Sequence, residues 1–566
     1  MSAHSHPHGV KAAAAVSKVH FATRQPVDFV VVGSGAAGGI VARELAAAGL
    51  DVVLLEQGPY RAYGDFVHDE LAVMFNNELM GGAGNVQTFR PTATDTAQVQ
   101  NNPPPAMYAQ TVGGSSVHYS GNFWRFRPVD FKERSKLGPI AGTGFDDWPI
   151  TYEELEPYYT RVDWEIGVSG VPGPFDAPRS KPYPVPPMPV KSSGVLFEAG
   201  AKKLGLHPQP APVAVLSQPF NGRPACIHCG FCLGFGCEVG AKSSTLYTMI
   251  PQALASGHCE LRTGCAALRV ETGADGRVTE VVYRDASGVT QAQRAKAVVL
   301  CANGAETPRL LLMSASARFP NGLANGSGRV GQYLMFNTDA ATHAVFDEPL
   351  NDYKSIQVTR LALDFYDSDP KRGFYGGGGI DARSYLGATP MLFALAIVPP
   401  DVPRWGAEYK RYLAHAFTRN MTSLAVGTSL ALESNNITLD PTHKDGIGRP
   451  ALRVTYSDHA DDLKLGKFLQ DRAVEILDAA GAKKVWREEV KSGTVSPHLL
   501  GTCRMGDDPK TSVVDRFHRT HEVRNLFLCD GSSFVTSGRG QPTMTIQALA
   551  FRAAEHIARF AKQGEI

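Results

Sequence analysis

The stretch of the chain that most constrains its fold is residues 28–58, where a short apolar run leads into three glycines and a helix-compatible segment, residues 36–48. Gly33, Gly35 and Gly38 have the spacing G-x-G-x-x-G. At this spacing the glycines allow a tight turn, a close approach of the backbone to a pyrophosphate, and close packing of the helix on the strand. The helix N-terminus adds free N–H groups and the positive end of a dipole, both of which favour a phosphate.

A second apolar run, residues 52–55, ends at Glu56, which follows Gly33 by 23 residues. A carboxylate at this place can accept hydrogen bonds from the ribose of an adenosine. Strand, glycines, helix, strand and acid in this order predict a unit that binds an adenine dinucleotide. The residues expected to contact it are Gly33, Gly35, Ala36, Ala37, Gly38 and Glu56. The pattern by itself leaves open whether the dinucleotide is FAD or NAD.

The length and net charge of the chain restrict the classes of protein to which it can belong. A chain of 566 residues is too long for one compact core, so two or more domains are expected. The formal net charge is +1, so nucleic acid is not an expected partner. No run of eighteen apolar residues occurs, so an integral membrane protein is not expected. Residues 1–26 lack the apolar core of a signal peptide, and we expect a disordered tail there and, by default, a cytoplasmic protein.

Strand and helix patterns alternate along the rest of the chain. Residues 260–301 contain short strand patterns separated by Asp-Gly and Ser-Gly turns, which predict a β-meander beside the nucleotide unit. Residues 340–440 predict a second domain with an antiparallel sheet. Helices are expected over residues 458–480 and from about 545 to 562.

A further glycine-rich segment has small side chains and exposed amides. Such a backbone can lie flat against a planar cofactor, and a tight turn lined with small residues is the alternative interpretation. The segment consists of Gly113, Gly114, Ser115 and Ser116.

Four of the nine cysteines lie within twelve residues, in the segment ACIHCGFCLGFGCEVG. Their spacing, C-x2-C-x2-C-x4-C, puts thiolates on a glycine-containing loop that can wrap an iron–sulfur cluster. A ferredoxin run would continue C-x3-C-P, but here the last gap is four residues and Glu238 replaces the proline. Zinc, with His228 as a further ligand, and a reduced loop without metal are the alternatives. The candidate ligands are Cys226, Cys229, Cys232 and Cys237, and most of the other cysteines are predicted to be buried small hydrophobes.

Together with later motifs, these features resemble the glucose–methanol–choline (GMC) oxidoreductases, flavoenzymes that oxidise alcohols. The likeness extends from Asp28 to the C-terminal helix. It is carried by the nucleotide motif, by GGSS at 113–116, by GAETP at 304–308 with the following RLLLMS, by HLLGTCRMG at 498–506, by CDGS at 529–532 and by PTMTI at 542–546.

The resemblance implies an α/β fold in which a discontinuous, Rossmann-like FAD-binding domain is joined to an α+β substrate domain with an antiparallel sheet. The FAD-binding domain is expected to comprise residues 27–170, 226–335 and 498–566, including the cysteine loop 226–237, and the substrate domain residues 171–225 and 336–497. The resemblance implies FAD rather than NAD. It adds Gly113, Gly114, Ser115, Ser116, His118, Asp530, Gly531 and Thr543 to the expected cofactor-binding residues.

Two residues carry the implied chemistry. His498 matches the family's catalytic histidine near the flavin, and a neutral imidazole can take the hydroxyl proton as hydride leaves the carbon. Gln541 departs from the family pattern, which has Asn or His before this Pro-Thr; its amide is one methylene longer, and we expect it to position the substrate oxygen. His118 lies where some relatives bond a histidine covalently to the flavin and others do not, so covalent attachment stays open.

The resemblance also bears on the route of the electrons. Sugar and sugar-acid dehydrogenases of the gluconate dehydrogenase type carry a three-cysteine iron–sulfur insertion at a similar place; Cys226, Cys232 and Cys237 look like that trio, with Cys229 extra. Those relatives often work with a helper subunit, which carries the export signal, and with a cytochrome. Export with such a partner is therefore the alternative to a cytoplasmic location.

We predict an FAD-dependent dehydrogenase that oxidises a CH–OH group of a sugar, polyol or related alcohol and passes electrons through an iron–sulfur cluster to an external acceptor. The main alternative is an aryl or long-chain alcohol oxidase that uses oxygen, makes hydrogen peroxide and has no cluster. A flavin-containing lyase or a non-catalytic subunit is the third hypothesis.

Overall fold

The computed structural model describes residues 16–384 and 387–566. Most of the predicted disordered tail, residues 1–15, lies outside the described residues. The next few residues are held by hydrogen bonds: Ser17 Oγ accepts from the Leu261 amide at 3.0 Å, and the Phe21 amide donates to Glu260 at 2.8 Å. Within the described part of the chain, no helix is long and apolar enough to cross a membrane.

The glycine motif opens a parallel sheet with the strand order β6-β2-β1-β9-β17. The central strand β1 is β-branched and almost entirely buried, as expected for a parallel strand covered on both faces. These strands are β1 (Val27–Val32), β2 (Val52–Glu56), β6 (Cys259–Thr263), β9 (Thr290–Leu300) and β17 (Leu526–Leu528). Because β17 lies some 500 residues from β1 in the sequence, the C-terminal part of the chain completes the sheet that the N-terminal part begins.

The N-terminal half of β9 continues into an antiparallel hairpin series with β8 (Val278–Arg284) and β7 (Ala266–Thr272). The predicted β-meander over 260–301 is therefore confirmed for three strands. The first strand of that stretch, β6, instead pairs in parallel with β2. The pairing of β6 is thus set by its neighbour β2 in the parallel sheet and not by the turn residues that follow β6.

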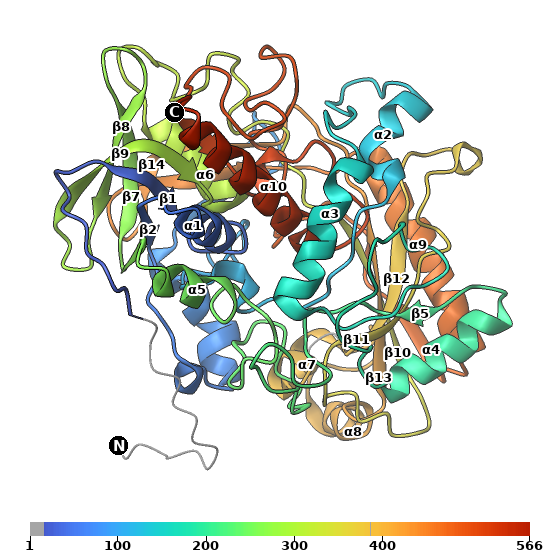
Figure 1. Cartoon of the computed structure of the whole chain (residues 1–566). Coiled ribbons are helices and arrows are strands. Elements are labelled where there is room, and N and C mark those ends of the chain that lie inside the picture. Colours follow the sequence, from blue (N-terminus) through green and yellow to red (C-terminus); the bar gives the residue numbers. More distant parts are fainter. Residues whose placement is uncertain (1–15, 385–386) are drawn as a thin grey trace.

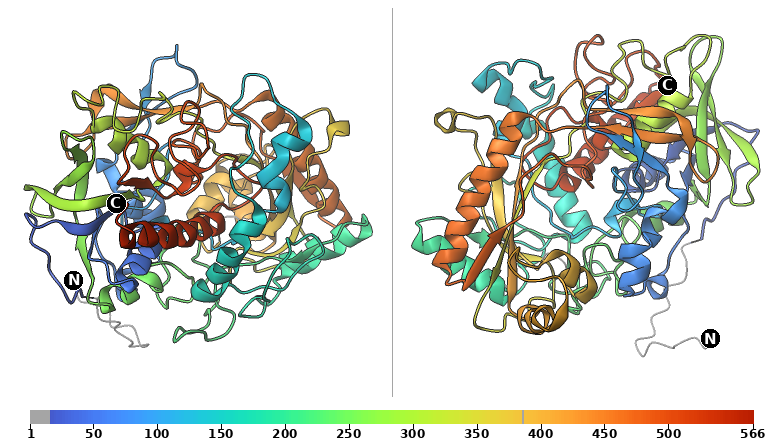
Figure 2. Two further views of the ribbon diagram at one scale, coloured as in Figure 1. Left: turned by 45° about the horizontal axis from the view of Figure 1, so that its top comes forward. Right: turned by 180° about the vertical axis from the view of Figure 1, so that it is seen from behind.

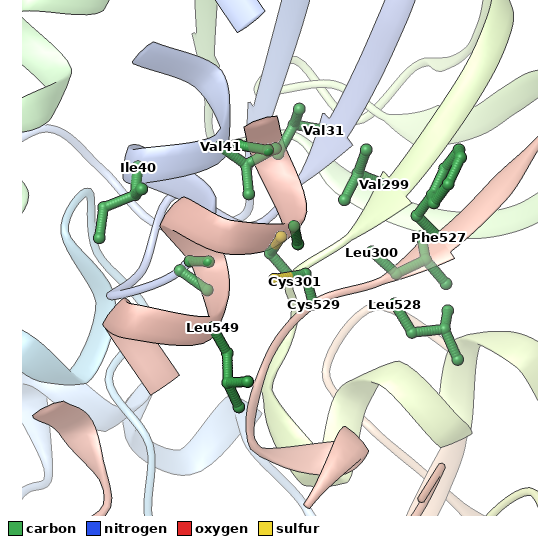
Figure 3. Packing of buried hydrophobic residues seen from close by; sticks show 14 of the residues in the cluster. Val31, Ile40, Val41, Val299, Leu300, Cys301, Phe527, Leu528, Cys529 and Leu549 are labelled. Atoms are coloured by element: carbon green, nitrogen blue, oxygen red, sulfur yellow. The ribbon is translucent and has the colours of Figure 1, made fainter. Parts of the chain in front are cut away.

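Helices α1 (Gly38–Ala47), α5 (Met249–Ala255) and α10 (Thr543–Lys562) pack together beside this sheet (Figure 1). Between sheet and helices lies a close-packed apolar core. Figure 3 shows Val31, Val299 and Phe527 from three neighbouring strands beside Val41 of α1 and Leu549 of α10. This core fixes the strand ends and helix N-termini that carry the glycine motif.

A second, six-stranded antiparallel sheet has the order β16-β10-β13-β12-β11-β5. It lies at the other end of the molecule from β1, with α9 and α4 against its outer face (Figure 2). Its elements are β5 (Gln209–Pro210), β10 (Thr338–Val345), β11 (Val358–Ala362), β12 (Gly378–Arg383), β13 (Asn420–Gly427), β16 (Lys484–Arg487), α4 (Ser192–Lys203) and α9 (Ala460–Ala479). The predicted antiparallel sheet and the predicted helix over 458–480 are thus confirmed.

A small third sheet has the order β14-β15-β3-β4 and packs against α6. The strand pattern near residue 436, predicted as part of the second sheet, belongs here instead, because β14 pairs with β15 and β15 runs parallel to β3. The remaining elements are β3 (Gln87–Arg90), β4 (Gln98–Val99), β14 (Asn436–Lys444), β15 (Pro450–Thr455), α2 (Pro128–Leu137), α3 (Tyr152–Val162), α6 (Asn303–Met313), α7 (Pro390–Ala396) and α8 (Gly406–Ala416).

Candidate active site

A cavity of about 670 Å³ lies between the parallel sheet and the antiparallel sheet. Its walls bring together residues from all parts of the chain. Of the residues predicted from the sequence, those that line it are Gly33, Gly35, Ala36, Ala37, Glu56, Gly114, Ser115, Ser116, His118, His498, Asp530, Gly531, Gln541 and Thr543. Gly38, Gly113 and the four clustered cysteines do not line it.

The glycine turn at one end of the cavity is packed too tightly for side chains. A Cβ on Gly38 would lie 1.8 Å from the carbonyl oxygen of Gly33, and a Cβ on Gly33 would lie 2.5 Å from the carbonyl oxygen of Cys301. Gly38 thus lets α1 pack on the turn, while Gly35 faces the cavity with only Gly114 near it, at 3.8 Å. The same contact explains Gly114, whose Cβ would lie 2.7 Å from the Cα of Gly35.

The turn leaves polar groups for a dinucleotide. No side chain caps the N-terminus of α1, so the positive end of its dipole is open to a phosphate, although the amides of Gly39 and Ile40 already donate to the carbonyls of Gly35 and Ala37. Glu56, at the end of β2, accepts from the amide and hydroxyl of Ser34 at 3.0 and 2.7 Å and from the amide of Gly58 at 2.9 Å. Burial raises the pKa of Glu56 although these bonds oppose the rise. Glu56 also lines the cavity, where its carboxylate oxygens can accept from a ribose hydroxyl.

The C-terminal motif meets this end of the cavity through Asp530. Its carboxylate accepts from the Asn303 amide at 3.0 Å, the Thr307 hydroxyl at 2.6 Å and the Ser532 amide at 2.8 Å. It therefore ties the start of α6 to the strand end after β17. Gly531 follows directly, and a Cβ there would lie 2.6 Å from the Leu499 carbonyl. The predicted motifs at 304–308 and 529–532 are thus side by side.

His498, on the wall of the cavity, is held from three sides. Its backbone amide donates to Ser496 Oγ at 2.9 Å, its Nδ1 lies 3.1 Å from Asn337 Oδ1, and its Nε2 lies 3.1 Å from Gln541 Oε1. Burial, aided by the positive charge of Arg383 and opposed by the hydrogen bond with Gln541, lowers the pKa of the imidazole to about 4. The ring is therefore neutral at neutral pH.

Asn337 fixes which ring nitrogen carries the proton. Its Nδ2 donates to the carbonyls of Gly427 at 2.9 Å and Gly538 at 3.0 Å, so its Oδ1 must face His498. An oxygen at that place requires a proton on Nδ1, which leaves the lone pair on Nε2. Asn337 has a left-handed backbone, with φ of 65°, which asparagine tolerates well.

Gln541 is free to serve both protonation states of Nε2. Its amide has no other hydrogen bond among the residues that the structure describes. With the amide nitrogen toward His498, Gln541 donates to the lone pair of the neutral ring; with the oxygen toward it, Gln541 accepts from the protonated ring. The side chain of Gln541, although one methylene longer than that of asparagine, thus places its amide within hydrogen-bond distance of Nε2.

Sequence reasoning missed several polar residues of this region. Asn337 and Asp339 flank the start of β10, and Asn122 lies on the wall near His118. Both amide atoms of Asn122 are buried without a hydrogen-bond partner in the described chain. No motif marks these residues, because only the register of the second sheet brings β10 to His498.

His118 is buried and lines the cavity, with Nε2 lacking a protein partner within the described residues. Burial, together with the positive charge of Lys242, lowers the pKa of His118 to about 4. A neutral ring nitrogen without a partner at the cavity wall fits contact with a bound ligand.

The cysteine loop does not form a ligand set in this structure. Across residues 16–384 and 387–566, no three His, Cys, Asp or Glu side chains are grouped to hold a metal ion, and the predicted iron–sulfur cluster, like zinc, is therefore not supported. Hydrogen bonds from a lysine hold the loop instead: the buried Lys242 ammonium donates to the carbonyls of Tyr119, Cys232 and Phe235. The Cys237 thiol accepts from the Lys242 amide at 3.4 Å.

The other five cysteines are buried, as predicted. They are Cys259, Cys265, Cys301, Cys503 and Cys529. Cys301 and Cys529 lie in the core shown in Figure 3, at the ends of β9 and β17.

Comparison with protein families identifies two matching regions. Models described as GMC oxidoreductase match residues 27–335 and 431–550. The chain is 36% identical over 548 residues to 2-methyl-1,2-propanediol dehydrogenase of Mycolicibacterium austroafricanum, covering 94% of this chain and 95% of that protein. It is 30% identical over 576 residues to the gluconate 2-dehydrogenase flavoprotein of Pantoea cypripedii, covering 94% and 93%.

The fold is also similar to that of a solved structure. The crystal structure of formate oxidase superposes with a TM-score of 0.67 at 15% sequence identity, over 96% of this chain and 100% of that chain. This likeness agrees with the predicted α/β fold.

Proposed function

The chain belongs to the GMC oxidoreductase family, and on that premise we propose that it is an FAD-dependent dehydrogenase that oxidises the CH–OH group of an alcohol, polyol or sugar. The observation that carries the proposal is the neutral His498, whose Nε2 lone pair faces Gln541 in the same cavity as the dinucleotide motif. An alcohol needs such a base for its hydroxyl proton.

The residues present fit the cofactor that the family implies. The turn with Gly33 and Gly35, the uncapped start of α1, Glu56 and the cavity volume together suit an adenine dinucleotide. We assign FAD binding to these groups, to the 114–116 turn, and to Asp530, Gly531 and Thr543. When bound, FAD supplies the acceptor for a hydride. We assign His118 a contact with the flavin rather than a covalent bond.

His498 and Gln541 handle the proton. Nε2 of His498 takes the proton of the substrate hydroxyl, and Asn337 Oδ1 keeps the Nδ1 proton in place as the ring becomes positive. The Gln541 amide is the group that orients the hydroxyl oxygen beside Nε2. Because His498 lies on the cavity wall, a bound substrate would shield the ring from water that competes for the base.

The substrate class follows from relatives that cover almost the whole chain. Their names specify a propanediol and gluconate, both of which carry several hydroxyl groups. We propose the same class here, with residues 171–225 and 336–497 as the substrate domain and residues 27–170, 226–335 and 498–566 as the FAD domain.

Electrons leave to an external acceptor in this proposal. No step is assigned to the cysteine loop, because its side chains do not form a ligand set in the described chain. A helper subunit and a cytochrome stay predictions. Without a cluster, an oxidase that reduces oxygen to hydrogen peroxide is the second candidate.

Turnover with two acceptors separates these candidates. With a propanediol as substrate, we expect turnover with a dye acceptor under nitrogen and only a small fraction of that rate as peroxide in air. Peroxide formed at a rate that matches turnover would show an oxidase and contradict the dehydrogenase proposal. A sample heated to denaturation serves as the blank for both assays.

The low pKa of His498 predicts the pH dependence of flavin reduction. The base must be unprotonated, so its contribution is lost as pH falls through the pKa of about 4. We expect anaerobic flavin reduction at saturating substrate to be independent of pH above about 5.5 and to fall tenfold per pH unit at the acid end. An acid limb near the ordinary value of about 6.5 would instead show that the ring is not desolvated.

A further inference from the structure

One face of the second sheet forms the wall of the cavity opposite the glycine turn. Alternate residues of a strand point to opposite faces. On β10, Ala340 and Ala344 pack in the core under α9, so Asp339 points the other way, into the cavity. Its partner across the ladder is Val426 on β13, which also lines the cavity.

Asp339 differs from the other acids at the cavity. Glu56 accepts from Ser34 and Gly58, and the lining acids Glu306 and Asp530 are likewise paired. Within the described part of the chain, the Asp339 carboxylate accepts no hydrogen bond and has no cation within 4 Å. The Asp339 side chain is exposed to the cavity among apolar neighbours, so a bound ligand that displaces water from this wall has to supply the hydrogen bond itself.

The surroundings indicate what kind of group that is. Leu424 and Val426 flank Asp339 with apolar surface, and desolvation at this wall raises its pKa to about 7, opposed by the charge of Arg383 and aided by the charges of Asp381 and Asp458. Arg383 also lines the cavity and is paired with the buried Asp381. Its positive charge disfavours a cationic ligand group beside it, and Asp339 itself disfavours an anion. A neutral donor, a hydroxyl, satisfies both.

We infer that Asp339 determines substrate specificity by accepting a hydrogen bond from a second hydroxyl, so that the site selects diols and polyols over alcohols with one hydroxyl. The inference rests on the proposed function, in which His498 and Gln541 hold the hydroxyl that reacts. Asn337, which is hydrogen-bonded to His498, precedes Asp339 by two residues at the start of β10, and both His498 and Asp339 line the cavity, so one substrate can meet both groups.

Binding of non-oxidisable alcohols tests the inference without turnover. Pinacol and its analogue lacking one hydroxyl have no hydrogen on a carbon that bears oxygen, so neither can be oxidised. Each is titrated into the FAD-loaded protein, and binding is read from the change in flavin absorption. We expect pinacol to bind at least about tenfold more tightly, as for a hydrogen bond to a charged group.

Three variants test whether Asp339 is the source of the preference for pinacol. Asp339→Leu should reduce the ratio to within about twofold, and Asp339→Asn, which keeps an amide acceptor, should retain part of it. Asp347→Leu is the matched control: this exposed acid lies just beyond the end of β10 and pairs with Lys483. The control should keep the wild-type ratio. Flavin content and thermal unfolding show whether each variant is folded. If Asp339→Leu does not fold, the affinity ratio of Asp339→Asn tests the inference in its place.

The kinetic counterpart uses 2-methyl-1,2-propanediol and its analogue without the tertiary hydroxyl. Asp339→Leu should lower kcat/KM for the diol at least about tenfold and change that of the mono-alcohol less than threefold. Equal pinacol and mono-alcohol affinities in the wild type, or an unchanged ratio in Asp339→Leu, would overturn the inference. If no alcohol is oxidised but the ratio depends on Asp339, the proposed reaction fails and the diol site stands.

Discussion

Replacing His498 with alanine should lower the rate of flavin reduction by an alcohol by about 10²- to 10⁴-fold, the range that a positioned general base contributes. The variant loses the Nε2 lone pair beside Gln541, which stays free because Asn337 holds the ring proton on Nδ1. FAD content should not change, because the side chain of His498 bonds to Asn337 and Gln541 and to none of the groups assigned to the dinucleotide. Anaerobic mixing with substrate, followed by loss of flavin absorption, measures the rate.

A second histidine variant controls for the loss of a ring. His521 is half-buried and hydrogen-bonded to Ser512 at 2.9 Å, and it does not line the cavity. His521→Ala should reduce flavin at the wild-type rate. If His498→Ala with full FAD content also does so, His498 is not the proton acceptor and the mechanism proposed above is wrong.

Replacing Gly38 with alanine should remove FAD binding almost completely. The new Cβ would lie 1.8 Å from a backbone oxygen, that of Gly33, so no side chain can move aside and the turn itself must open. Overpacking costs about 1–3 kcal/mol where side chains can adjust, and more is expected against backbone. FAD content after desalting and the melting temperature both report the effect, and both should fall.

Alanine variants of two other glycines distinguish a steric clash within the protein from a clash with the cofactor. Gly35 faces the cavity, and a Cβ there meets only Gly114 at 3.8 Å. Gly35→Ala should therefore fold with an unchanged melting temperature as apoprotein but bind FAD more weakly. Gly64→Ala, where nothing lies within 4 Å, should change neither. Full FAD content in Gly38→Ala would show that the glycine turn does not position the dinucleotide.

The parts of the fold that could be predicted are those set by local pattern. The glycine spacing of residues 33–38 and the apolar runs on either side predict β1, α1 and β2 to within two residues. The helix predicted from residue 545 begins at Thr543. Motifs far apart in the sequence, such as those around residues 304 and 530, could be joined only through the resemblance to the family.

Pairing partners could not be predicted, because they depend on strands distant in sequence. The sequence pattern of β6 is the same as that of the meander strands that follow it, yet β6 pairs with β2. Asn337 and Asp339 belong to no motif, and only the register of β10 against β13 aims them at the site. The cysteine spacing suggested a metal site, whereas the loop is closed by the buried Lys242, whose long side chain reaches three carbonyls.

The central claim is that this chain removes hydride from a CH–OH carbon while His498 holds the hydroxyl proton. Anaerobic reduction of the bound flavin by a propanediol, compared with the same diol carrying deuterium on the carbinol carbon, tests it most directly. We predict that the flavin is reduced in one phase, that deuterium slows this phase, and that His498→Ala abolishes it. A flavin that stays oxidised with alcohols, diols and sugars alike, in protein that retains FAD, would contradict the claim.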